Sequence, residues 1–186
     1  MINSKKELAD YLAEDSANYK RAIGLKGLIK HFGCTPNNDQ YYIWRYIKTL
    51  RYYEYHLNKF TITHRFIARY YLCHLRKLAY KTGFQIPPNV LREGVTIWHF
   101  GTIIINEYSS IGHHCVLNPD VIIGWKGPGM GAPKIGNNVF IGGSSTIIGD
   151  IMIGDNVIIA PNSAVTKSFP SNCIIGGCPA KIIKNI

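Results

Sequence analysis

From residue 105 onward, aliphatic side chains return at every sixth position of the chain. Ten of the eleven positions on this six-residue step are Ile, Leu or Val, where chance would give about three. The positions are Ile105, Ile111, Leu117, Ile123, Gly129, Ile135, Ile141, Ile147, Ile153, Ile159 and Val165. A period of six is neither helical nor a simple alternation, so it predicts a solenoid of short strands and turns that stack on one another.

The aliphatic pattern is broken at two places. Leu91 and Ile97 keep the six-residue phase, but the next phase starts at Ile105, a slip of two residues beside His99. Further on, residues 125–132 take the place of one hexad, and their glycines and proline predict a loop that leaves the coil. A break in an otherwise regular solenoid is a place where a functional site is expected.

The first 83 residues carry helical signals instead. Ser4 and Glu7 form a capping-box pattern, which predicts a helix from there to about Tyr19. Three more helices are predicted, over 22–31, over 40–58 after a turn cluster at 35–39, and over 64–81 with Thr63 as the cap and Gly83 past the end. We therefore expect an α-helical region over 1–83 and a β-solenoid over 84–186.

Charge and composition support this division. Residues 1–83 hold 15 Lys or Arg and 6 Asp or Glu, whereas residues 84–186 hold 6 and 5.

The apolar content excludes intrinsic disorder, and no apolar run approaches the roughly 20 residues that a membrane span requires. The start of the chain lacks an apolar signal-peptide region, and the five scattered cysteines suit reduced thiols. These features predict a cytoplasmic location.

Two interpretations of the basic, aromatic third and fourth helices remain open. Their aromatic side chains can pack in the core and between subunits, with the cations on a solvated face. Alternatively, they form a surface that contacts a membrane or an anionic polymer. Nucleic acid binding is disfavoured because no recognition motif accompanies the charge.

The second half resembles the hexapeptide-repeat acyltransferases. The tracts IGNNVFIGGSSTIIG, IGDNVIIAPNSAVTK and GGCPAKII carry the resemblance, and KTGFQIPP followed by HFGTIIIN is similar to the serine acetyltransferase-like branch, which includes acetyltransferases of capsule and other surface sugars. The resemblance implies a mainly β fold with α, namely a left-handed parallel β-helix behind the helical region. It also implies a homotrimer that binds acetyl-CoA in the groove between neighbouring β-helices.

The same resemblance places the catalytic base at His99, and an imidazole is suited to remove a proton from an attacking hydroxyl near neutral pH. Trp98 and Phe100 are candidates for holding the acceptor, and Asp120 for orienting His99 or the acceptor hydroxyl, since one coil plus the slip brings it beside His99. The expected acetyl-CoA contacts are Gly142, Gly143, Ala160, Thr166, Lys167, Lys181 and Lys184. Lys126 in the predicted loop is a further candidate for an anionic group, and no metal site is expected.

Three positions depart from serine acetyltransferases. Gln85 and Trp98 each stand where that family has Asp, and Gly131–Ala132 replace an Arg-His pair. Because these side chains hold the amino acid or orient the base, the sequence favours transfer of acetyl to a sugar hydroxyl in surface polysaccharide synthesis. The alternatives are a serine O-acetyltransferase of cysteine biosynthesis and a non-catalytic β-helix that docks on a membrane or glycan.

Overall fold

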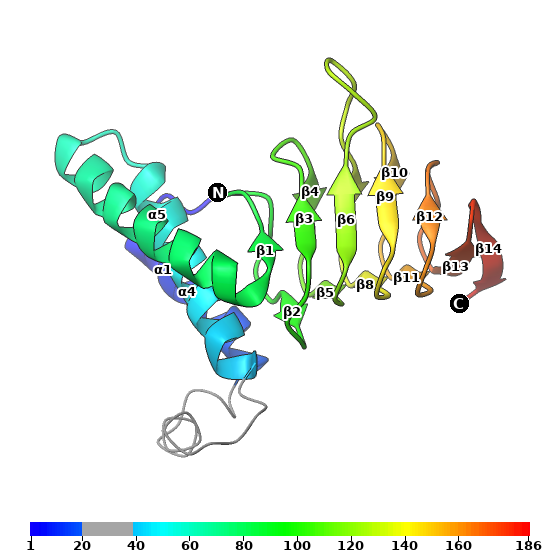
Figure 1. Ribbon diagram of the computed structural model, residues 1–186, viewed down its shortest axis with the longest axis horizontal. Helices are drawn as coiled ribbons and strands as arrows, with labels where there is room; N and C mark the ends of the chain where they lie inside the picture. The colour runs from blue at the N-terminus through cyan, green and yellow to red at the C-terminus, as the bar shows by residue number, and fades with distance from the viewer. Residues whose placement is uncertain (20–38) are drawn as a thin grey trace.

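The computed structural model describes residues 1–19 and 39–186, and within them a layer of helices covers one end of a three-sided parallel β-helix (Figure 1). The predicted helix over 22–31 and most of the turn cluster before the third helix lie outside these residues. The helices are α1 (Lys5–Ala17), α4 (Asp39–Leu57) and α5 (Ile62–Thr82). α5 ends at Gly83, which takes a positive φ of 84°, and the first strand begins at Phe84.

Local signals placed these three helices correctly, with small errors at their ends. The Ser4 capping box is present, because the Ser4 side chain accepts from the Glu7 N–H and the Glu7 side chain accepts from the Ser4 N–H. α5, however, begins at Ile62, two residues before its predicted start, with Thr61 and not Thr63 at the N-cap. Thr61 makes no side-chain capping bond. Without that bond, the first turn of α5 carries no strong sequence signal.

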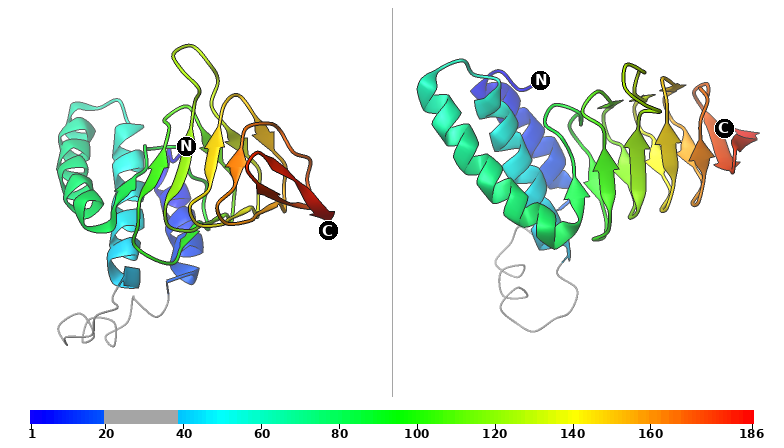
Figure 2. Two further views of the ribbon diagram at one scale, coloured as in Figure 1. Left: turned by 45° about the vertical axis from the view of Figure 1, so that its right-hand side comes forward. Right: turned by 45° about the horizontal axis from the view of Figure 1, so that its top comes forward.

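The chain winds through three sheets in a fixed order (Figures 1 and 2). Sheet A holds β1 (Phe84–Gln85), β3 (Ile103–Ile105), β6 (Val121–Gly124), β9 (Thr146–Ile148) and β12 (Ala164–Val165). Sheet B holds β4 (Ser110–Ile111), β7 (Lys134–Ile135) and β10 (Met152–Ile153). Sheet C holds β2 (Thr96–Ile97), β5 (Val116–Leu117), β8 (Phe140–Ile141), β11 (Ile158–Ile159), β13 (Cys173–Gly177) and β14 (Ala180–Asn185).

The strand pairing explains both breaks in the repeat. Ile105 pairs with Ile123, eighteen residues on, which is one coil of three hexads. Ile97 pairs with Leu117, twenty residues on, so the slip of two is absorbed in the turn that contains His99. Ile123 pairs with Ile147, twenty-four residues on, because residues 125–132 leave the coil as a loop.

The repeating aliphatic side chains point into the prism and form its core. All ten aliphatic positions of the six-residue ladder are buried. The small residues four places later point inward as well, among them Cys115, whose thiol is buried and has its pKa raised to about 11 by burial. Non-glycine residues with positive φ occupy the prism corners, and Asn138, Asn156 and Asn172 form a side-chain ladder along one of them. Two buried positions per hexad therefore produce the period of six.

A buried ion cluster fastens the helices to the first coil. The guanidinium of Arg51 is fully buried and bonds Asp15 at 2.8 Å and Glu54 at 3.0 Å. It also donates to the backbone carbonyls of Leu91 and Arg92. The two carboxylates in turn accept backbone N–H groups of the first coil, from Gly94 and Asn89. Because each of the three charged groups is hydrogen-bonded to another of them and to the backbone of the first coil, the cluster ties the helical layer to the β-helix.

Candidate active site

The turn with the slip of two connects β2 to β3 and presents His99 to solvent. The His99 side chain is 71% exposed, and its Nδ1 lies 3.7 Å from Oδ2 of Asp39. At this distance the two groups are adjacent but are not hydrogen-bonded. Asp39 is the first residue of α4, where the positive end of the helix dipole favours a carboxylate.

A second contact ties the same helix end to the His99 turn. Gln40 Nε2 donates to the backbone carbonyl of Trp98 over 2.7 Å. Just upstream, the buried hydroxyl of Tyr19 accepts from the N–H of Ile97. The imidazole therefore projects from a turn that the helical region holds on two sides.

Asp39 was not found by sequence reasoning, which placed it in a turn cluster ahead of the helix. It lies sixty positions from His99 in the chain, and no local pattern joins the two. The one usable signal was an acidic side chain immediately before a predicted helix.

Asp120 lies beside the His99 turn, as the coil arithmetic predicted, but it makes a different contact. Its Oδ1 accepts from the backbone N–H of Thr102 over 3.2 Å. Thus Asp39, not Asp120, makes the carboxylate contact with His99, because Asp120 is used to close the turn. A role for Asp120 toward an acceptor hydroxyl remains a prediction.

The two aromatic neighbours of His99 differ in exposure. Trp98 is 45% exposed and offers a free apolar face. Phe100 is half-buried and packs against the ring of Tyr42 on α4, with ring centroids 6.2 Å apart. Of the two rings that were expected to contact an acceptor, only that of Trp98 is exposed enough to do so.

His99, Gly142, Gly143 and Ala160 all lie along one corner of the prism, between sheets C and A. Two of these expected acetyl-CoA contacts have their backbone N–H groups already paired between coils. The N–H of Gly142 donates to the carbonyl of Ile159, and that of Ala160 to the carbonyl of Ile175. A Cβ on Gly142 would lie 2.5 Å from the backbone nitrogen of Pro161, so glycine is needed there for coils to stack.

The remaining acetyl-CoA candidates lie elsewhere on the chain. Thr166 and Lys167 follow β12 at the corner between sheets A and B. Lys181 and Lys184 are exposed on β14, which pairs antiparallel with β13. A single chain therefore does not bring Lys167 to the corner that carries His99.

The loop over 125–132 also stands at the corner between sheets A and B. It borders an open cavity of about 600 Å³, which Tyr108, Trp125, Met130 and Asp150 help to line. Ala132 is buried and Gln85 is exposed on β1. Neither side chain supplies a charge to the His99 corner.

Within residues 1–19 and 39–186, no group of three or more His, Cys, Asp or Glu is arranged to hold a metal ion.

Comparison with known proteins agrees with the repeat. The family model described as bacterial transferase hexapeptide (six repeats) matches residues 132–167. A serine acetyltransferase of Synechococcus elongatus is 35% identical over 115 residues, which cover 60% of this chain and 46% of that protein. The chain thus spans about half the length of this curated relative.

Solved structures agree with the fold. The Neisseria gonorrhoeae serine acetyltransferase in complex with serine has a TM-score of 0.65 at 22% identity, covering 97% of this chain and 71% of that one. A serine acetyltransferase in complex with CoA has a TM-score of 0.68 at 20% identity, covering 96% and 70%. The predicted left-handed β-helix behind a helical region is therefore confirmed, as is the resemblance to the hexapeptide-repeat acyltransferases.

The contact between Asp39 and His99 gives a first testable prediction. Asp39→Asn keeps the shape of the side chain but removes its charge, so the imidazolium formed at His99 during proton transfer loses the nearby carboxylate that stabilises it. We expect kcat for acetyl transfer to fall between about tenfold and a hundredfold, with little change in KM for acetyl-CoA. Steady-state CoA release measures both quantities.

Asp10→Asn on the exposed side of α1 is the matched control and should leave kcat unchanged. Equal kcat values for Asp39→Asn and the wild type would remove Asp39 from the site.

Proposed function

We propose that this chain, whose β-helix carries the transferase hexapeptide repeat and whose relatives include serine acetyltransferases, is an acetyl-CoA-dependent O-acetyltransferase. The observation that carries the proposal is the exposed imidazole of His99, held beside the carboxylate of Asp39 at the break in the repeat. It supplies a base at a site that is open to both substrates.

In the proposed reaction, an imidazole nitrogen of His99 takes the proton of an acceptor hydroxyl as its oxygen attacks the thioester carbonyl carbon. The new C–O bond forms, the C–S bond breaks, and the CoA thiolate leaves and is protonated. No acetyl-enzyme forms. Cys115, one candidate thiol, is buried, and burial raises its pKa.

A homotrimer would complete this site. His99 lies at the corner between sheets C and A, whereas Lys126, Lys167 and the loop lie at the corner between sheets A and B. A groove between two copies can bring these two corners together, and one copy cannot. We therefore place acetyl-CoA between neighbouring copies, with the lysines toward its phosphates.

Serine is the first candidate acceptor, because the relatives are serine acetyltransferases and one similar structure holds serine. The comparisons give no support to a role in polysaccharide synthesis, which the sequence alone favoured. A sugar hydroxyl stays the second candidate on one observation. Trp98 is exposed beside His99, and an aromatic face of that kind suits a sugar ring.

An acceptor panel tests the proposal. CoA thiol release from acetyl-CoA is measured with L-serine, glucose, galactose or no acceptor. Release with L-serine supports the first candidate, and release only with a sugar supports the second. Release with none of them, from protein that is folded by circular dichroism, would overturn the proposal.

A further inference from the structure

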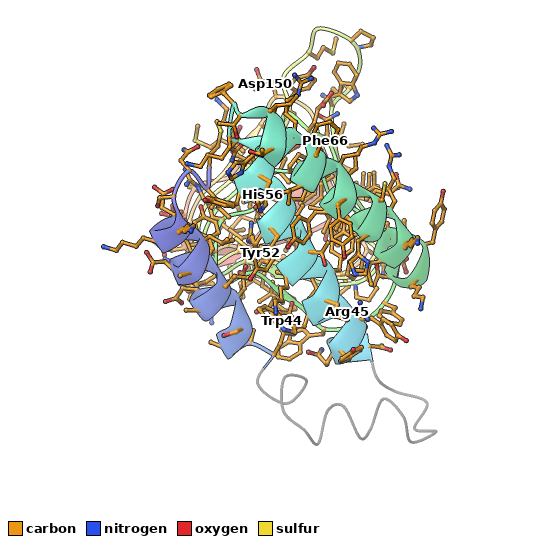
Figure 3. All side chains as sticks on the ribbon, turned by 90° about the vertical axis from the view of Figure 1, so that its left-hand side faces the viewer. Trp44, Arg45, Tyr52, His56, Phe66 and Asp150 are labelled. Carbon is orange, nitrogen blue, oxygen red and sulfur yellow. The ribbon has the colours of Figure 1, made fainter. Side chains whose placement is uncertain are left out.

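The outer side of α5 exposes large apolar side chains along most of its length. Ile62, Phe66 and Tyr70 follow one another at a spacing of four residues, so they lie on one face of the helix. Phe66 is 73% exposed and Tyr70 68%, and Tyr80 extends the row toward the C-terminal end. Phe60 stands fully exposed just before the helix. Figure 3 looks onto this helical layer and shows Phe66 on α5, beside α4.

Cations flank this row, and acidic residues are absent from the whole segment. Between Tyr55 and Arg92 the sequence contains no Asp or Glu. The exposed Arg65 and Arg69 lie beside the apolar row, one turn apart. Further exposed cations are Arg76, Lys77 and Lys81, and the half-buried Lys59 stands just before the helix. The outer face of α5, meaning the apolar row with these cations, is therefore both hydrophobic and strongly positive.

Such a face is typical of an interaction surface. A run of exposed aromatic and aliphatic side chains with basic flanks exceeds what a merely solvated helix shows. Nothing in residues 1–19 or 39–186 covers these side chains. A second copy of this chain would place arginines against arginines, and like charges across an interface oppose association.

We propose that the outer face of α5 binds the surface of a membrane that contains anionic lipids. The aromatic and aliphatic side chains would enter the boundary between headgroups and acyl chains, and the arginines would meet lipid phosphates. None of the helices in the described part of the chain is long and apolar enough to cross a membrane. Binding is therefore peripheral, with α5 lying in the plane of the surface.

Vesicle sedimentation with the full chain tests this surface. Vesicles of phosphatidylcholine alone are compared with vesicles that also contain phosphatidylglycerol, at low and high salt. We expect binding to the mixed vesicles only, and weaker binding as salt rises. Arg65→Gln and Arg69→Gln should each weaken binding roughly fivefold, and a variant with Ile62→Ser, Phe66→Ser and Tyr70→Ser together should lose it.

The matched charge control is Lys5→Gln with Lys6→Gln on α1, which should bind like the wild type. Circular dichroism checks that each variant is folded. Equal binding by the wild type and the α5 variants, or no binding of the wild type, would overturn the proposal. So would self-association in sedimentation velocity that the α5 serine variant abolishes, because the face would then join two copies. Acetyl transfer is not a readout of this experiment, so its outcome is independent of the proposed activity.

Discussion

His99→Ala lowers kcat for acetyl transfer by about a hundredfold to ten thousandfold, the usual contribution of a general base. The affinity for acetyl-CoA changes little, because the substitution removes a group that acts on the acceptor proton. Initial rates of CoA release over a range of acetyl-CoA concentrations separate the two effects.

His113→Ala is the matched control for this substitution. His113 is also a surface histidine beside a carboxylate, with its Nδ1 2.8 Å from Glu93, but it lies at the corner between sheets B and C. It should retain the wild-type rate. An unchanged kcat in His99→Ala, or an equal loss in His113→Ala, would remove the proposed base.

Arg51→Ala destabilises the fold by about 3–5 kcal/mol, because it leaves the buried carboxylates of Asp15 and Glu54 without their cation. Urea denaturation measures the loss. Lys48→Ala, an exposed position on the same helix, should stay within about 0.5 kcal/mol of the wild type. A loss in Arg51→Ala no larger than in Lys48→Ala would mean that the cluster does not hold the helices on the β-helix.

The pH dependence of this variant has a definite sign. Burial raises the pKa of Glu54 in the folded protein, against the opposing effect of Arg51. Without Arg51 the pKa of Glu54 in the folded state rises further above its pKa in the unfolded state. At pH values between these two pKa values, the folded state therefore binds more protons than the unfolded state. Stability of Arg51→Ala therefore increases as pH falls through that window, from the folded pKa of Glu54 toward its unfolded pKa. A deficit that stayed constant over the same range would contradict this account.

The repeat was predictable because each hexad contributes the same two inward side chains, and the pattern is therefore written locally along the chain. The position of the turn that presents His99 followed from the same reasoning, since the slip between Ile97 and Ile105 falls there. The role of His99 stays a prediction. The Ser4 cap was predictable because it is a contact between residues three apart.

Long-range contacts were not predictable in this way. The approach of Asp39 to His99 depends on how the helical layer sits on the first coil, which Arg51 fixes through residues far apart in the chain. The pairing of the Gly142 and Ala160 N–H groups was not visible in the sequence, because hydrogen bonds between coils have no residue signature. Charge alone likewise did not decide whether α5 buries or exposes its aromatic side chains. The structure shows that Phe66 and Tyr70 are exposed.

Direct transfer of acetyl from CoA to a hydroxyl, with His99 as base, is tested most directly by following the acetyl group. Protein in excess is mixed with acetyl-CoA, first without acceptor and then with L-serine or a hexose, and both protein and acceptor are analysed by mass spectrometry. The account predicts unmodified protein at every stage and, once the right acceptor is present, acetylated acceptor equal to the CoA released. His99→Ala should produce almost none. Acetylated protein before acceptor is added, or CoA release without acetylated acceptor, would contradict it.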